Sequence, residues 1–131
     1  MAALEFAIVS PVLATLLLAM FQFGIGMQQY MNVSNAATQG ALALARGGTT
    51  PYTTTTAAVK SAAPNLTASS ITTTVTIGGS ACTTDATCTT KLTSGATASV
   101  TVSYPCSLSV MGVNYAPSGC NLVGQSAQMV Q

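Results

Sequence analysis

A long apolar stretch without charge lies near the N-terminus and constrains this chain more than any other feature. From Phe6 to Ile25 the sequence FAIVSPVLATLLLAMFQFGI has no charged side chain and is long enough to cross a bilayer as a helix. The first charge after Glu5 is Arg46, and the residues between them are mostly rich in helix formers. We therefore expect one long helix that ends at Gly47 and Gly48.

The apolar segment is too large to remain exposed in water. About fifteen large apolar side chains lie on all faces of the expected helix between Leu4 and Met31, each worth roughly 1.5 to 3 kcal/mol when buried. Monomeric proteins rarely expose apolar patches of more than a few hundred square ångströms, and the rest of the chain is too small to cover this one. We expect the segment to lie in lipid, in a partner or in a bundle of its own copies.

Proline and glycine interrupt the helical pattern inside this segment. Pro11 cannot donate a hydrogen bond to the carbonyl of Ala7 and crowds that turn, so we expect a kink or a local opening there. Gly24 and Gly26 mark a second weak point.

Glu5 is a carboxylate at the edge of the apolar helix. Such a group costs about 2.5 to 3.5 kcal/mol if it reaches the bilayer centre, and it usually has a partner. Residues 1–45 contain no lysine or arginine. The nearest positive group is an α-amino terminus, so we expect Glu5 to pair with that of Met1 or with that of a neighbouring copy.

Length and charge exclude several classes of function. With 131 residues the chain can hold one small domain and an appendage. Charged residues make up 4%, against roughly 25% in soluble domains, and the net charge of +1 offers no field to attract nucleic acid. The chain lacks histidine, and its two carboxylates lie far apart in the sequence. We therefore expect no enzyme, no catalytic residue, no metal ion, no cofactor, no nucleic acid and no small-molecule substrate.

The four cysteines favour disulfide bonds formed outside the cytosol. Zinc is the competing interpretation, but four-cysteine zinc sites normally use short pairs, whereas five, seventeen and thirteen residues intervene here. A redox function is disfavoured because no Cys-x-x-Cys is present. Three connectivities are open, and sequence does not choose among them. We favour sequential pairing, Cys82 with Cys88 and Cys106 with Cys120, each bridge being worth about 2 to 4 kcal/mol.

The second half of the chain predicts a short helix and a small sheet. Thr50 can cap a helix over about 51–63, with Pro51 at its first position. The small apolar face of this helix would lie on a sheet and consists of Ala58, Val59, Ala62 and Ala63.

Two runs of alternating residues predict half-buried strands. ITTTVTI at 71–77 places Ile71, Val75 and Ile77 on one face. TASVTVSY at 97–104 turns four side chains inward, namely Ala98, Val100, Val102 and Tyr104. A last strand near 122–131 has a weaker pattern. We interpret the segment between the first two strands as a connection in which Cys82 and Cys88 close a small loop, and we expect Cys106 and Cys120 to tie down the excursion before the last strand.

Threonine clusters at 53–56 and 83–90 have two interpretations. Threonine suits exposed strand positions and keeps a nearly uncharged surface soluble. O-glycosylation of the clusters is the alternative. Asn32 and Asn65 begin Asn-x-Ser/Thr triplets, to which we assign no role.

The opening AALEFAIVSPVLATLLLAMFQFG, at 2–24, resembles the signature of TadE-like pilins, a branch of the type IV pilin superfamily built by tight-adherence systems. In that signature an acidic residue and a phenylalanine precede an apolar helix that contains proline. VTVSYPCS at 100–107 is similar to the VTVSYPF-type stretch of the same family. The threonine-rich middle matches only loosely.

The resemblance implies a processing and assembly pathway. A prepilin peptidase would cut after a glycine, the new first residue would often be N-methylated, and the acidic residue would guide the subunit into the growing fibre. Glu5 falls on that acidic position if Met1 is the first residue after cleavage, and Met1 as a translation start is the alternative. The residues implied in the filament-core helix are Phe6, Pro11, Leu16, Leu17, Phe21, Phe23, Gly24 and Gly26.

Together these features predict an α+β, type IV pilin-like fold. We expect a long apolar helix at 1–48 and a threonine-rich, disulfide-bonded domain at 49–131. The expected function is a structural pilus subunit for surface attachment, a homopolymer handled by the pilus assembly machinery. It would lie in inner-membrane lipid as a monomer and outside the cell once assembled. A minor pilin of the same system and a single-span, membrane-anchored adhesin or binding domain are the alternatives.

Overall fold

The computed structural model describes residues 2–107, 109–110, 113–114 and 116–131. Its dominant element is α1, Ala2–Ala45, a helix of 44 residues and thus about 66 Å long. The chain leaves the helix at Gly47, whose φ of 67° suits glycine and whose N–H donates to the Leu44 carbonyl at 3.0 Å. The predicted helix and its end at the paired glycines are confirmed.

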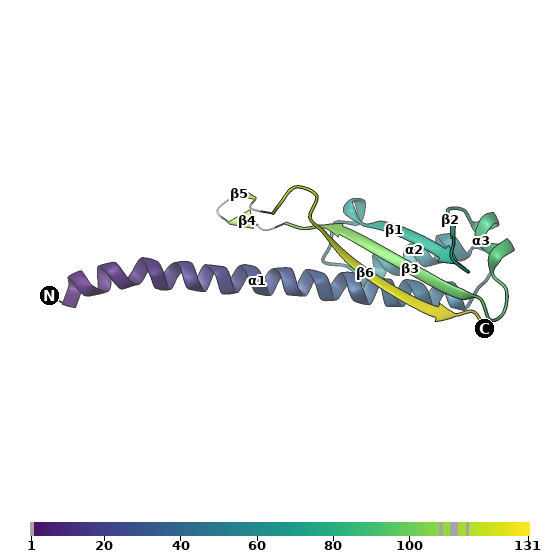
Figure 1. Cartoon of the computed structure of the whole chain (residues 1–131), viewed down its shortest axis with the longest axis horizontal. Coiled ribbons are helices and arrows are strands. Elements are labelled where there is room, and N and C mark those ends of the chain that lie inside the picture. The colour runs from purple at the N-terminus through teal and green to yellow at the C-terminus, as the bar shows by residue number, and fades with distance from the viewer. Residues whose placement is uncertain (1, 108, 111–112, 115) are drawn as a thin grey trace.

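The remaining elements form a small layer along one end of α1 (Figure 1). In chain order they are α2 (Pro51–Ala62), the 3₁₀ turn η1 (Ala68–Ser70), β1 (Thr72–Ile77), β2 (Ser80–Cys82), α3 (Asp85–Lys91), β3 (Thr97–Pro105), β4 (Ser109–Val110), β5 (Val113–Asn114) and β6 (Asn121–Met129). The main sheet has the antiparallel order β2-β1-β3-β6, and β4 pairs separately with β5. This arrangement confirms the predicted α+β fold class.

The strand patterns orient the sheet as the alternation predicts. Val75 and Ile77 of β1 are buried while its flanking threonines are exposed or half-buried. In β3 the side chains of Ala98, Val100 and Val102 are buried, and Tyr104 packs at the margin of the core. The last strand, β6, begins one residue before the predicted start and pairs with β3 along its whole length.

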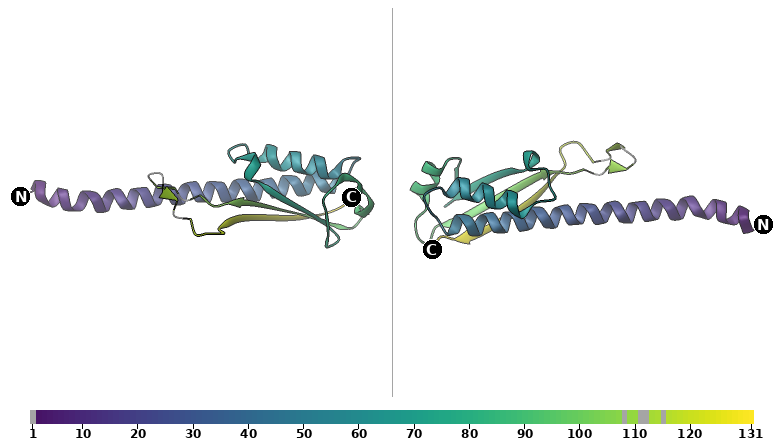
Figure 2. Two further views of the ribbon diagram at one scale, coloured as in Figure 1. Left: turned by 90° about the horizontal axis from the view of Figure 1, so that it is seen from above. Right: turned by 180° about the vertical axis from the view of Figure 1, so that it is seen from behind.

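The core lies where the sheet meets the C-terminal third of α1. Figures 1 and 2 show α2 beside this part of the helix and the sheet along another side. Small residues allow the close approach, since Ala36, Ala37 and Ala41 of α1 are fully buried together with Val33 and Leu44.

The prediction that α2 packs on the sheet was wrong. Its buried residues, Pro51, Thr55 and Val59, face α1 more than the sheet, and only a minor contact reaches β1. The reason is Gly40 of α1, which has no side chain, so that the side chains of Val59 and Thr55 approach its backbone. Thr50 occupies the predicted N-cap position, but its side chain makes no capping hydrogen bond there.

Two elements between β1 and β3 were not predicted. The strand β2 returns beside β1, and the short helix α3 follows it. The side chain of Thr84 accepts the N–H of Thr87, whose hydroxyl in turn lies 3.2 Å from the Thr84 N–H, a reciprocal cap that starts α3.

Candidate functional site: the exposed apolar helix

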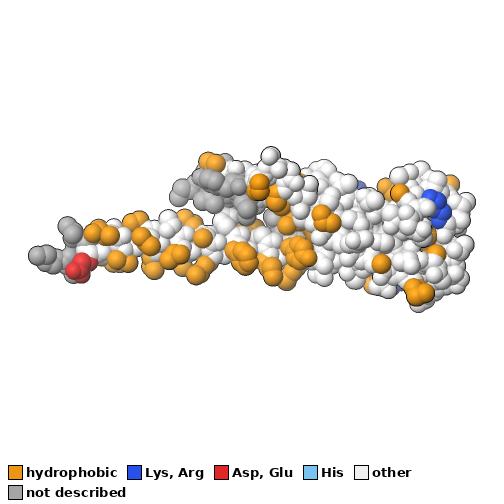
Figure 3. Space-filling model, in the orientation of Figure 1, with side chains coloured by type: hydrophobic (Ala, Val, Ile, Leu, Met, Phe, Trp, Pro, Cys, Tyr) orange, Lys and Arg blue, Asp and Glu red, His pale blue; other side chains and the backbone are white. Residues whose placement is uncertain are grey.

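The N-terminal part of α1 projects from the rest of the fold as an apolar rod. Phe6 and Phe23 are 72% and 74% exposed, and the large apolar side chains between them are all at least 40% exposed. Figure 3 shows hydrophobic side chains along this rod and a single acidic group near its end. By length and composition, Glu5–Ala45 is a candidate membrane span.

The rod contains the residues that the sequence assigned to an assembly surface. Leu16, Leu17 and Phe21 are exposed by more than half of their surface, as Phe6 and Phe23 are. A Cβ added at Gly24 or at Gly26 would meet no atom within 4 Å. These side chains have no cover within the described part of the chain, so the surface is available to lipid or to a partner.

Pro11 lies inside α1, which continues through it without interruption. A kink at this position therefore stays a prediction. Glu5 is exposed in the first turn of α1, where a carboxylate interacts favourably with the helix dipole. Met1 lies outside the described residues, so the pairing of Glu5 with an α-amino terminus also stays a prediction.

The two disulfides have the predicted sequential connectivity. Cys82 bonds to Cys88, both buried in the core, with an S–S distance of 2.04 Å. Cys106 bonds to Cys120, with an S–S distance of 2.03 Å, and closes the segment that carries β4 and β5. All four cysteines are paired in these two bridges, and none is free.

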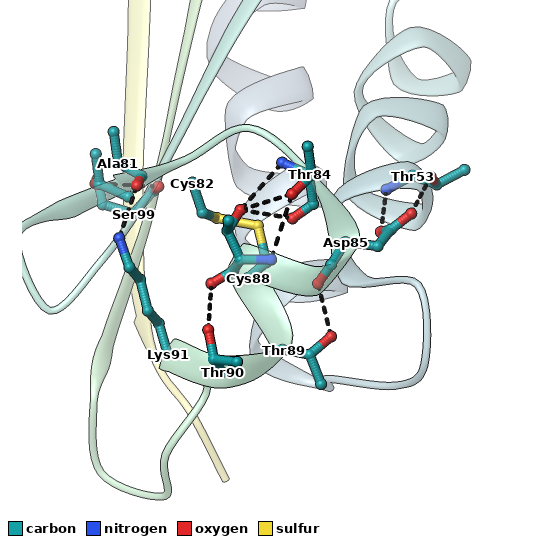
Figure 4. The surroundings of a disulfide bond; sticks show 12 residues. Thr53, Ala81, Cys82, Thr84, Asp85, Cys88, Thr89, Thr90, Lys91 and Ser99 are labelled. Carbon is teal, nitrogen blue, oxygen red and sulfur yellow. Dashed lines mark hydrogen bonds between the residues drawn. A yellow bond between two sulfur atoms is a disulfide. The ribbon is translucent and has the colours of Figure 1, made fainter.

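Asp85 joins α3 to α2 through hydrogen bonds that sequence reasoning did not find (Figure 4). Its carboxylate accepts the hydroxyl of Thr53 at 2.6 Å and the Thr53 backbone N–H at 2.9 Å. The hydroxyl bond, followed by the backbone bond, lowers the pKa of Asp85 below its usual value of 3.8. Nearby, Lys91 donates to the Ala81 carbonyl at 2.9 Å. Both charged side chains therefore hold neighbouring elements in place.

The residues next to Asp85 carry a sequence signal that could have placed it at the start of a helix. Thr84 is a good N-cap residue, and an acidic residue in the first turn of a helix is favoured by the dipole. Its partner Thr53 lies 32 positions away, and no sequence pattern links the two. Among the described residues, no group of three or more His, Cys, Asp or Glu side chains is arranged to hold a metal ion.

The chain was compared with protein families, with curated proteins and with solved structures. Neither the curated proteins nor the solved structures contain a match to this chain. The similarity noted at residues 100–107 lies outside the matched segment and stays a prediction. Residues 1–42, which include the whole exposed rod, match the model of the family described as TadE-like protein, and the N-terminal segment of this chain is therefore TadE-like.

Proposed function

We propose that this chain is the structural subunit of an extracellular, Tad-like pilus of the type IV class and that it polymerises through α1. The TadE-like segment associates the chain with a tight-adherence pilus system. The observation that carries the proposal is the largely exposed apolar rod from Phe6 to Met31, joined to a small folded layer whose core packs on the opposite end of the same helix.

The free energy of transfer explains how such a rod can assemble. In the monomer the rod lies in the inner membrane, and in the fibre it lies among the rods of other copies. Both surroundings are apolar, so the move from lipid to fibre does not expose the rod to water. The sheet and its threonine-rich outer face then cover the outside of the fibre.

Glu5 supplies the position of each subunit along the fibre. A carboxylate in an apolar surrounding needs a positive partner, and residues 6–45 contain none. The α-amino group of a neighbouring copy meets this need, and each subunit enters at the height where the two groups meet. Before assembly, a prepilin peptidase exposes that amino group, and N-methylation of the terminus keeps its positive charge.

The two-part organisation at residue 48 is part of this proposal. Residues 1–48 supply the assembly helix and residues 49–131 the threonine-rich surface domain. Since Val33–Ala45 packs under the sheet, the helix is also the support on which that domain folds.

Substitution of Glu5 tests the mechanism. We expect Glu5→Ala to abolish surface fibres or to reduce them severely, because the carboxylate can no longer select the position of the subunit. Fibre yield is measured by electron microscopy and by quantifying the sheared fraction. The matched control is Asp85→Asn, which removes the other acidic side chain of the chain and should leave fibres in place. Normal fibre yield from cells carrying Glu5→Ala would contradict the mechanism.

A further inference from the structure

A mostly apolar groove lies between the middle of α1 and the segment closed by the Cys106–Cys120 disulfide. Its volume is about 290 Å³. One wall is formed by α1 and includes Phe23, Gly26, Met27 and Tyr30 together with Gln22 and Gln29. The other includes Ser107, the disulfide and Leu122 at the start of β6. Figure 1 shows the segment that carries β4 and β5 reaching back over α1 toward the N-terminus.

Both walls of the groove are held by bonds within one molecule. The disulfide fixes Cys106 to Cys120, and the Cys106 N–H also donates to the Cys120 carbonyl at 3.1 Å. The adjoining pair, Pro105 and Asn121, closes the end of the ladder between β3 and β6. The groove is therefore formed before any partner binds, which lowers the entropy cost of binding.

The lining selects for an uncharged apolar occupant. None of the residues that line the groove is charged. An apolar cavity of about 150 Å³ admits a benzene ring, so this groove can take one or two large apolar side chains. At Gly26 a partner can approach the helix backbone closely, since among the described residues no atom lies within 4 Å of a Cβ built there.

We propose that the groove receives apolar side chains from residues 6–21 of α1 of a second copy of this chain. This inference rests on the proposed function. The segment has the required chemistry, because it is uncharged and its large apolar side chains are 40% to 72% exposed. The nearest charged side chain, that of Glu5, lies outside this segment.

The groove requires an axial shift between the two copies. Two parallel helices at the same depth in a bilayer would align residues 6–21 with each other. To bring that segment to the level of Gly26, one copy must move outward by 5 to 20 residues, which is about 8 to 30 Å along the helix axis. The contact therefore forms when a subunit has left its depth in the membrane, and side-by-side monomers do not make it.

Photocrosslinking in assembled fibres tests the contact. A benzophenone side chain replaces Met27, which lines the groove, and in a matched control it replaces Met129, which is exposed, does not line the groove and lies outside residues 6–21. We expect the Met27 probe in sheared fibres to crosslink to residues 6–21 of a second copy, with at least about tenfold less of this product in membranes that lack fibres. The Met129 probe should not crosslink to residues 6–21 of a second copy.

Other products of the Met27 probe would overturn the inference. These are crosslinks only to lipid, only to residues 49–131 of a second copy, or in equal amount in fibres and in membranes. If the fibres contain this chain and the crosslinks go elsewhere, the groove contact alone is wrong. If purified fibres do not contain the chain, the proposed function is wrong and the groove contact fails with it.

A pair of glycine substitutions gives an independent test. Gly26→Leu fills the groove from its own helix, whereas Gly24→Leu adds the same side chain two positions away, outside the lining. Both positions are open in the subunit, so neither change should disturb its fold. We expect Gly26→Leu to lower fibre yield by at least about tenfold relative to Gly24→Leu. Equal yields from the two variants would overturn the inference.

Discussion

Two glycines set how closely α1 approaches the elements packed on it. A Cβ at Gly124 of β6 would lie 2.7 Å from the Val33 carbonyl oxygen and 2.9 Å from the Ser34 Cα. A Cβ at Gly40 of α1 would lie 2.6 Å from Cγ2 of Val59. The first contact is with backbone, which cannot move without shifting the helix. Gly124 therefore fixes the distance between α1 and the sheet.

We expect Gly124→Ala to lower the free energy of unfolding by about 1 to 3 kcal/mol, because the added methyl group forces α1 away from β6. For a domain of this size each kcal/mol lowers the unfolding midpoint by about 4 to 8 °C. The measurement is thermal unfolding of the full chain in detergent, followed by tyrosine fluorescence. Gly24→Ala is the matched control, since that position is open. An unchanged midpoint for Gly124→Ala would show that the sheet does not depend on this approach.

The sequence held a partial signal for this residue. A glycine within a strand pattern often marks a place where another backbone comes close. The strand pattern around β6 is too weak for that signal to be used. The backbone that approaches Gly124 belongs to Val33 and Ser34 of α1, and this depends on tertiary packing.

At the level of elements, α3 is held against α2 by one carboxylate. The hydrogen bonds from Thr53 stabilise the ionised form of Asp85 and lower its pKa in the folded state. A lowered pKa means that the contribution to stability is fully present above the usual value of 3.8 and is lost as the pH falls through the folded-state pKa. The connection between α2 and α3 should therefore weaken in acid.

We expect the unfolding midpoint of the full chain to fall more steeply below pH 3.8 than that of an Asp85→Asn variant. Comparison of the two proteins isolates the effect of Asp85, because the rest of the chain is the same in both. The measurement is thermal unfolding at neutral pH and at two acidic pH values. Parallel curves for the two proteins would contradict a stabilising role for the ionised carboxylate.

An element could be predicted from the sequence where the pattern of its own residues determines it, and could not where packing against distant residues determines it. The helix α1 is a long uncharged apolar run rich in helix formers, and the strands β1 and β3 alternate in polarity, so the sequence was sufficient to place all three. The helix α3 was missed because DATCTTK is rich in threonine, a poor helix former, and its capping box uses Thr87 where glutamate or glutamine is usual. The predicted packing of α2 on the sheet was wrong because a helix face of small residues can pack on another helix as well as on a sheet.

At the scale of the whole molecule, the two parts of α1 have different surroundings: one part is exposed and the other is buried under the sheet. Its exposed rod ends near Met31, and the part from Val33 to Ala45 is packed under the sheet. The exposed site was predictable because its residues are contiguous and their apolar character is plain. The groove beside the Cys106–Cys120 disulfide was not, since its two walls are distant in sequence.

We expect residues 32–131 to fold in solution with both disulfides formed, whereas residues 49–131 should remain unfolded or aggregate. The shorter fragment lacks Val33 and Leu44, which are fully buried and worth about 1.5 to 3 kcal/mol each. Those losses are large against a total stability of about 5 to 15 kcal/mol. Circular dichroism and chymotrypsin resistance of the two fragments provide the comparison. Equal resistance would contradict a supporting role for α1.

The central claim is that this chain is the polymerised component of a surface fibre. The most direct test is quantitative mass spectrometry of sheared, purified surface fibres alongside washed membranes from the same cells. We expect this chain to be the dominant protein of the fibre fraction. Finding the chain only in the membrane fraction, as a monomer, would contradict the account.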